Sequence, residues 1–335
     1  MTSAPRLPKP GFDRTSGSGA LSDRLAIALD RVILSPRHGS VAGLERTLLD
    51  ASEPYLRAYP VMALLFAIAN APLVAVAEAG RAGGSLPAAR RAARRALARA
   101  VAARARAARQ AAARAARRLR GARRIVTLSR SGIVTDALGR LAGRRAPEIL
   151  VAESLPAREG LVTARALVRR GIGVTVFPDA LLAAAAAGAD AVLVGADRLC
   201  EDGFVNKSGT LALTLGARVS RTPVIVAAES MKRLSSAVPL FLPPQRASDP
   251  RGGARRPRRR VARLRNPARG GGSGVRGPAG NPARVRTWSP IFEWVPYGEE
   301  TVVVTDGTAA PTNVRLHGGL IRILDRRARA SMRHS

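Results

Sequence analysis

Asp197 is the residue of this sequence whose type and surroundings best suit chemistry. It closes the apolar run that includes Val194, and Asp202-Gly203 and then the segment Asn206-Lys207-Ser208-Gly209-Thr210 follow it. A carboxylate that faces a lysine and an asparagine amide can transfer a proton while the ammonium holds a phosphate. The alternative is an Asp197–Lys207 ion pair that only braces the loop, and the residues by themselves leave both open.

Polar residues also follow five other short apolar runs. A single acid after a strand is ordinary turn chemistry or a helix N-cap, whereas six polar endings together favour a binding site. The six endings are Ser129-Arg130-Ser131-Gly132, Glu153-Ser154, Asp179, Gly195-Ala196-Asp197, Glu229-Ser230 and Asp306-Gly307.

The first of these endings suits a phosphate group. Ser129 and Ser131 provide two hydroxyls, Arg130 provides a guanidinium, and Gly132 permits a close approach of the backbone. The alternative is a helix N-cap beside a solvated arginine. We predict ligand contacts from Arg130 and Ser131.

The runs that precede these endings predict a parallel sheet. Continuous apolarity is typical of strands buried on both faces, and helix-like segments separate most of the runs. In such a sheet, ligands bind beyond the carboxyl ends of the strands. We therefore predict an α/β fold with a Rossmann-like, mostly parallel sheet. Its strands are expected at residues 125–128, 149–151, 174–177, 191–194, 224–227 and 301–304, with helices at 133–141, 160–169, 180–187 and 210–219.

The chain before the sheet is predicted to be helical. Residues 1–19 are rich in Pro, Ser and Gly and predict a disordered lead, and residues 20–120 predict a helical N-terminal domain. Its last helix, over 86–119, consists almost wholly of Ala and Arg, which are strong helix formers. The Rossmann-like domain is expected at 121–330, with a basic low-complexity insertion at about 244–287.

The charge of the chain is extreme and unevenly placed. Of its 56 basic residues, fourteen arginines lie between 90 and 124 and twelve between 251 and 286, with no acid in either stretch, and the net charge is +33. Such stretches can bind nucleic acid. The alternatives are a solvated helix in a GC-rich coding sequence and, for the insertion, a frameshift artefact.

Composition restricts several other functions. Cys200 is the only cysteine, so neither an intramolecular disulfide nor a multi-cysteine metal site is possible, and we expect no metal and no cofactor. The longest apolar stretch, 61–77, is short and contains Asn70 and Pro72, so we expect no membrane span. A cytoplasmic protein is the expectation.

Several motifs together resemble the initiation factor 2B alpha/beta/delta family, which also includes methylthioribose-1-phosphate and ribose-1,5-bisphosphate isomerases. The similar segments are Thr127-Leu128-Ser129-Arg130-Ser131, Glu153-Ser154-Leu155-Pro156, Gly195-Ala196-Asp197 with the Asn206–Thr210 segment, Val226 to Lys232, and Ser289 to Pro296. The resemblance implies a helical domain, then a Rossmann-like domain through which the chain dimerises. In the isomerases it implies a first-loop cysteine and the Gly-Ala-Asp aspartate, which open the ring and move a proton between the first two sugar carbons.

The match of the functional residues is partial. Asp197, Asn206 and Lys207 match, but Ser129 stands at the position of the family's catalytic cysteine, and its hydroxyl is essentially un-ionised at neutral pH. We therefore predict an initiation factor 2B-like protein that binds a small phosphorylated sugar or nucleotide through Arg130, Ser131, Glu153, Asp179, Asn206 and Lys207. One alternative is an aldose–ketose isomerase that uses Asp197 and Ser129. Another is a nucleic-acid-associated protein that acts through its arginine-rich segments.

Overall fold

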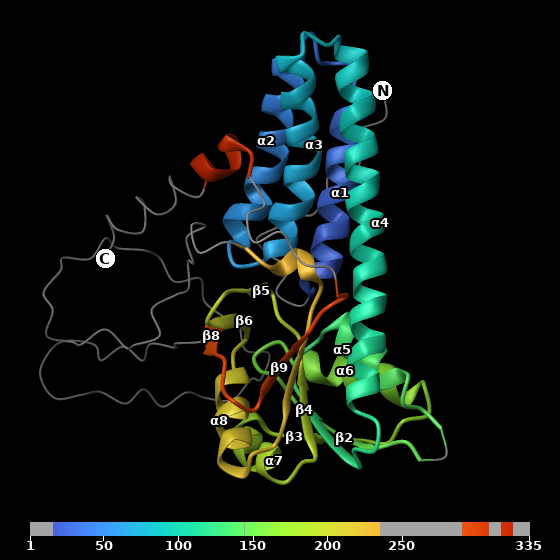
Figure 1. Ribbon diagram of the computed structural model, residues 1–335, viewed down its shortest axis with the longest axis vertical. Helices are drawn as coiled ribbons and strands as arrows, with labels where there is room; N and C mark the ends of the chain where they lie inside the picture. Colours follow the sequence, from blue (N-terminus) through green and yellow to red (C-terminus); the bar gives the residue numbers. More distant parts are fainter. Residues whose placement is uncertain (1–15, 144, 235–289, 308–315, 324–335) are drawn as a thin grey trace, which may run out of the picture.

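The computed structural model describes residues 16–143, 145–234, 290–307 and 316–323 (Figure 1). The predicted basic insertion at 244–287 lies outside the described residues, as do residues 1–15 of the predicted lead.

Four helices form the N-terminal region, as predicted. They are α1 (Ser18–Leu34), α2 (Val41–Ala58), α3 (Ala63–Arg81) and α4 (Leu86–Arg118). The first three pack beside the upper part of α4, which continues down to the sheet (Figure 1). Their shared core contains Leu25, Leu48 and Phe66, none of which is exposed to solvent. The helix over residues 318–323 adds Leu320 to this core.

The start of α1 differs from the prediction. Ser18 and Gly19 belong to this helix, although the composition of residues 1–19 predicts a disordered lead. Ser18 is buried, and its side chain forms a hydrogen bond with Asp197 of the sheet region. Composition favours disorder for a Ser/Gly segment, whereas this contact with a distant residue orders it.

Helix α3 is long and apolar enough to cross a membrane, by length and composition alone, with a mean hydropathy of 1.7 over its most apolar window. More than half of that window is buried inside the protein, and Leu64, Phe66 and Leu73 are fully buried. A core helix passes the same test, so the hydropathy of α3 is weak evidence for a membrane span.

Helix α4 lies against the sheet through its alanines. Pro87 occupies its first turn, where the missing N–H is not needed. Ala111, Ala112 and Ala115 are fully buried in the core beneath the sheet face. Their small side chains allow the helix to pack closely, and the arginines between them are left at its margins.

Six parallel strands form the main sheet, which confirms the predicted α/β class. They are ordered β3-β2-β1-β4-β7-β9, so the chain reverses its direction of growth between β1 and β4. Ligands bind at such a reversal in open α/β sheets. The strands are β1 (Arg124–Thr127), β2 (Glu148–Ala152), β3 (Val174–Phe177), β4 (Ala191–Val194), β7 (Val224–Ala227) and β9 (Thr301–Val304).

Helices cover both faces of this sheet. On one face, α4 packs with α5 (Gly132–Gly139) and α6 (Glu159–Val168), which contribute Leu138 and Leu167 to the core. On the other face, α7 (Leu182–Ala187) and α8 (Thr210–Ser220) contribute Leu182 and Leu213. Two short 3-10 helices, η2 (Asp179–Leu181) and η3 (Ser230–Lys232), follow β3 and β7.

A second, antiparallel sheet is the part of the fold that the sequence does not predict. It consists of β5 (Arg198–Leu199), β6 (Gly203–Lys207) and β8 (Phe292–Pro296). Asn206 and Lys207 precede the helix predicted at 210–219, and no strand is predicted there, but both lie in β6, where they pair with β8. This strand forms because a segment more than 80 residues away along the chain pairs with it, and no local pattern shows that partner.

Candidate functional site

The candidate site lies at the carboxyl ends of the parallel strands, where the helical region meets the sheet. The Ala63 N–H at the start of α3 donates a hydrogen bond to the Asp197 carbonyl (3.0 Å). At the start of α1, the Ser18 side chain bonds to the Asp197 side chain. Asp197, which follows β4 by three residues, is thus bonded to two helices of the N-terminal region.

Ser129 follows β1 in a strained backbone conformation. Its φ is +63°, and the φ of Ser154, which follows β2, is +62°; both values lie in the left-handed region that residues other than Gly rarely adopt. The two serines support each other, because the Ser129 N–H donates to the Ser154 Oγ over 2.6 Å. Strained residues persist where their surroundings fix them, and they concentrate at functional sites.

A buried ion pair lies beside Ser129. The Lys207 Nζ is 2.6 Å from the Glu159 Oε2, and the two side chains are only 5% and 9% exposed. The same Glu159 oxygen accepts a hydrogen bond from the Ser129 Oγ (3.1 Å). Glu159 was not among the predicted site residues, because it begins α6 and an acid in a first helical turn is ordinary.

The Asp197 carboxyl lies deep in the molecule, although part of the residue remains accessible. Burial raises its pKa, and the negative charges of Glu229 and Glu159 raise it further, while Lys232 and the hydrogen bond from Ser18 oppose the rise. Asp197 is therefore inclined to hold a proton. Its partners differ from those predicted, because Lys207 pairs with Glu159 and the nearby cation is Lys232.

Lys232 and Glu229 form a second buried pair, which is not among the predicted site residues. The Lys232 Nζ lies 3.1 Å from the Glu229 Oε2 and donates to the Ala196 carbonyl over 2.6 Å. Both side chains are less than 8% exposed. The sequence showed the polar ending at Glu229-Ser230. It did not show that the Lys232 side chain extends to the Ala196 carbonyl after β4.

The other predicted residues have mixed surroundings. Asp179 accepts hydrogen bonds from the backbone N–H groups of Ser154 and Leu155, both over 2.7 Å, so it shapes the loop after β2. Ser131 caps α5 by accepting a hydrogen bond from the Val134 N–H (3.4 Å). Asn206 is buried, and its side-chain amide donates to the Thr210 Oγ1 (3.0 Å).

Arg130 and Glu153 complete the predicted set. Arg130 is exposed at the rim of the β1 loop, and Glu153 is partly buried after β2. The structure thus brings Ser129, Asp197 and Lys207 together around Glu159.

The N-terminus of α8 is filled by an acid of the protein itself. The Glu293 Oε1 accepts a hydrogen bond from the Leu211 N–H (2.7 Å). Burial raises the pKa of this carboxyl, while the N–H groups of Leu211, Gly209 and Thr210 lower it. Free N–H groups at a helix start attract anions, and here Glu293 already satisfies them. A phosphate would therefore bind elsewhere in the site.

Comparison with known proteins places this arrangement in context. Residues 14–311 match the model of the initiation factor 2 subunit family. A putative translation initiation factor eIF-2B subunit 2-like protein of Pyrococcus furiosus is 40% identical over 111 residues, 32% of this chain and 40% of that protein. A ribose 1,5-bisphosphate isomerase of Haloferax volcanii is 41% identical over 86 residues, 25% of this chain and 27% of the isomerase. The alignments thus span less than half of either relative.

Solved structures share the fold over most of the chain. The translation initiation factor eIF-2B of Pyrococcus horikoshii has a TM-score of 0.66 at 22% identity and covers 88% of this chain and 92% of its own. The 5-methylthioribose 1-phosphate isomerase of the same organism has a TM-score of 0.61 at 18% identity. The match covers 94% of this chain and 84% of the isomerase. At these identities the likeness establishes the fold.

Proposed function

We propose that this chain, which belongs to the initiation factor 2 subunit family, binds a small phosphorylated sugar or nucleotide. The ligand would bind at the strand-end site, the group of Ser129, Glu159, Asp197 and Lys207 at the carboxyl ends of the strands. The observation that carries this proposal is the convergence of three acids and two lysines, Asp197, Glu159, Glu229, Lys207 and Lys232, at one edge of the sheet. Ionisable groups concentrated in a buried, strained location favour a binding site over a purely structural one.

Lys207 is the proposed phosphate-binding residue. Its ammonium is now paired with Glu159, so a phosphate must replace or share that carboxylate. The replacement of the carboxylate by a phosphate is chemically simple, since both groups present anionic oxygens that accept hydrogen bonds from the Lys207 ammonium. The raised pKa of Asp197 favours its protonated form, which carries no negative charge toward an incoming phosphate and can bond to a sugar hydroxyl.

Thermal unfolding in the presence of ribose 5-phosphate, ribose 1,5-bisphosphate and AMP tests the proposal. Binding to the folded state raises Tm, and the rise grows with ligand concentration. We expect Lys207→Ala to lose the rise and Arg169→Ala, an exposed control on α6's C-terminal side, to keep it. An unchanged rise in the Lys207 variant would remove this site from the proposal.

A second candidate function is isomerisation of a phosphorylated pentose. The raised pKa of Asp197 favours it, because burial moves the pKa of this carboxyl toward the range in which one group can donate a proton and take it back. Ser129 would then polarise the substrate from its bond to Glu159. A coupled assay with ribose 1,5-bisphosphate should show turnover that Asp197→Asn abolishes and Ser129→Cys increases. No turnover in the parent and in the Ser129→Cys variant would reject this function.

The assembly and cellular role are proposals of the same kind. A beta2-delta2 complex of eIF2B from C. thermophilum, which shares the fold at a TM-score of 0.56 and 19% identity, is tetrameric. We propose that this chain forms a homodimer through its Rossmann-like domain and acts in the cytoplasm in translation initiation. Sedimentation equilibrium measures the mass directly, and a single species near 35.1 kDa would exclude the homodimer.

A further inference from the structure

A cavity lies between the last turns of α4 and strand β9. Its volume is about 460 Å³, and its lining residues are Arg114, Arg117, Arg118, Val302, Val303, Val304 and Thr305. Cavities of roughly 300–1,000 Å³ are typical of sites for small molecules. None of its lining residues belongs to the strand-end site, so the function proposed above leaves this cavity unexplained.

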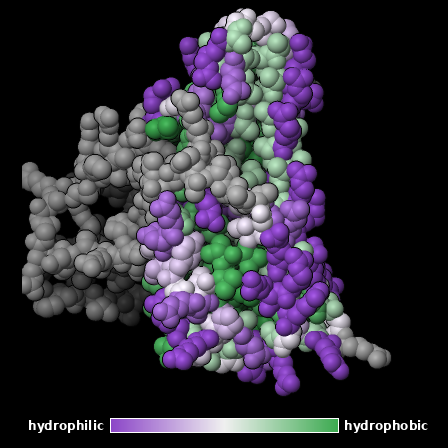
Figure 2. Space-filling view, viewed as in Figure 1, coloured by the Kyte–Doolittle hydropathy of each residue, from purple (hydrophilic) through white to green (hydrophobic). Residues whose placement is uncertain are grey.

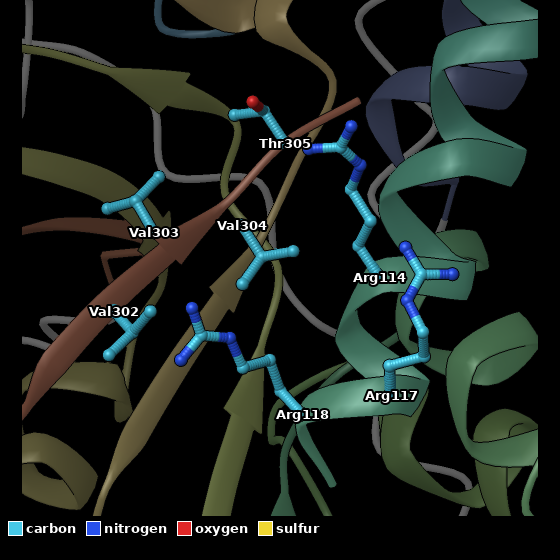
Figure 3. Close-up of a pocket in the computed structure, with 7 residues that line it drawn as sticks. All are labelled: Arg114, Arg117, Arg118, Val302, Val303, Val304 and Thr305. Carbon is cyan, nitrogen blue, oxygen red and sulfur yellow. The ribbon is translucent and has the colours of Figure 1, made fainter. Parts of the chain in front are cut away.

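The arginines reach the cavity because of helical spacing. Residues three and four apart share a helix face, so Arg114, Arg117 and Arg118 project from one side of α4. In Figure 3, Arg114 extends toward Thr305 and Arg118 extends toward Val302. Strand β9 is the last strand of the main sheet within the described ranges, so its outer edge is open to them.

The Arg114 guanidinium also lies at the end of β9. Its guanidinium lies so close to Gly307 that an added Cβ there would overlap it, and the φ of Gly307 is +85°. The same turn fixes the Thr305 hydroxyl, which accepts a hydrogen bond from the Gly307 N–H (3.3 Å). The Arg114 guanidinium and the Thr305 hydroxyl thus lie at the same end of β9.

The positive charge of the cavity has no acidic partner in the part of the chain that the structure describes. Elsewhere on the same helix, Arg94 pairs with Asp30 and Arg104 pairs with Asp23. No carboxylate lies within ion-pair distance of Arg114, Arg117 or Arg118 among the described residues. Like charges this close repel each other, and a bound anion would relieve that repulsion.

The opposite wall is apolar. Figure 2 shows a hydrophobic area at the position of β9, bordered by hydrophilic residues along the lower part of α4. Val302 and Val304 of this wall belong to or pack against the core beneath α4. A free phosphate ion would use only the arginines, whereas a ligand with phosphates at one end and a ring at the other would use both walls.

We propose that this cavity binds a small ligand that carries two or more phosphate groups, with Arg114 and Arg118 holding the phosphates and the β9 valines contacting its apolar part. Guanidinium groups bind phosphate oxygens through paired hydrogen bonds, and a ligand with two phosphates can engage Arg114 and Arg118 together. The cavity touches only residues 114 to 118 of α4, which favours a small molecule over a duplex, because a duplex would lie along the whole exposed length of the helix.

Titration calorimetry of the full chain with inorganic pyrophosphate and with ADP, in 150 mM NaCl, tests the proposal. We expect one equivalent of each to bind, and the double variant Arg114→Gln/Arg118→Gln to bind at least tenfold more weakly. The matched control is Arg91→Gln/Arg95→Gln, which removes the same charge at the same spacing from exposed positions of α4 outside the cavity. We expect this control to stay within about twofold of the parent.

Two further measurements distinguish binding in this cavity from binding elsewhere on the protein. Lys207→Ala should keep the pyrophosphate binding, since Lys207 belongs to the strand-end site; loss in that variant alone would assign the binding there and overturn the proposal. Equal losses in the two arginine double variants, or uptake of several equivalents, would show a diffuse attraction to the helix and would also overturn it. Helical circular dichroism confirms that each variant is folded.

Discussion

The Lys207 ammonium lies 2.6 Å from the Glu159 carboxylate in a pair that is almost fully buried. Glu159 begins α6 on one side of the strand-end site, and Lys207 ends β6 on the other. The pair therefore joins the main sheet region to the small antiparallel sheet. The same carboxylate also accepts a hydrogen bond from the Ser129 hydroxyl. A substitution of Lys207 should therefore also affect Ser129 at the end of β1.

Lys207→Ala should destabilise the protein markedly. It leaves the Glu159 carboxylate buried without its cation, which typically costs about 3–5 kcal/mol. Urea denaturation followed by circular dichroism measures the change.

A double variant separates the loss of the pair from the loss of side-chain volume. Glu159→Gln/Lys207→Met removes both charges and keeps similar shapes, so it should recover most of the stability. A single and a double variant of equal stability would contradict the idea that an unpaired charge causes the loss.

Asp197→Asn should change how stability depends on pH. The pKa of Asp197 is raised above its ordinary value of 3.8, so the folded protein favours the protonated carboxyl. The stability that this carboxyl contributes is complete below pH 3.8 and is lost as pH rises through the raised pKa. The Asn variant should therefore gain stability over the parent as pH increases from about 4 through the raised pKa of Asp197.

Denaturant midpoints of parent and variant, compared across that pH range, test this expectation. Asn retains an oxygen that can accept the hydrogen bond from Ser18. The comparison of the two stabilities therefore does not include the loss of that hydrogen bond. A parallel course of the two curves would mean that Asp197 ionises normally in the folded protein.

Gly160→Ala should distort the turn between β2 and α6. A Cβ at this position would collide with the backbone carbonyl of Ala152, which cannot move aside as a flexible side chain can. Such overpacking costs about 1–3 kcal/mol or more. Thermal unfolding gives the measurement.

Gly132→Ala, at the exposed first residue of α5, is the matched control. An added Cβ there meets nothing within 4 Å, and Ala favours a helix over Gly by up to about 1 kcal/mol. The expected order is therefore a stable Gly132 variant and a destabilised Gly160 variant, and the reverse order would refute the close approach.

Replacing Ser154 should reveal the cost of its left-handed backbone. Ser154→Ala removes the acceptor of the Ser129 N–H, a buried loss worth about 1–3 kcal/mol. Ser154→Gly removes the same acceptor but relieves a left-handed conformation that costs other residues about 1–2 kcal/mol. The Gly variant should be the more stable of the two, and chemical denaturation ranks them.

The sequence by itself determined the main architecture of this protein. Each of the six apolar runs is a parallel strand, and the central strands β4 and β7 are buried at every position because helices cover both faces of the sheet. The Ala/Arg composition of residues 86–118 was enough to predict α4, since helix propensity is a local property. The polar endings after the strands were expected at one edge of the sheet, and the parallel order of the strands brings them to that edge.

Only the tertiary structure decided which of those polar groups meet. Lys207 was expected to face Asp197, but β6 pairs with the distant strand β8 and directs Lys207 to Glu159 instead. Lys232 reaches Asp197's surroundings from η3, and Arg114 reaches the edge of β9 from α4. These contacts depend on how elements that are far apart in the chain pack against each other. Local propensity determines which elements form, whereas the environment of a charge depends on everything that surrounds it in space.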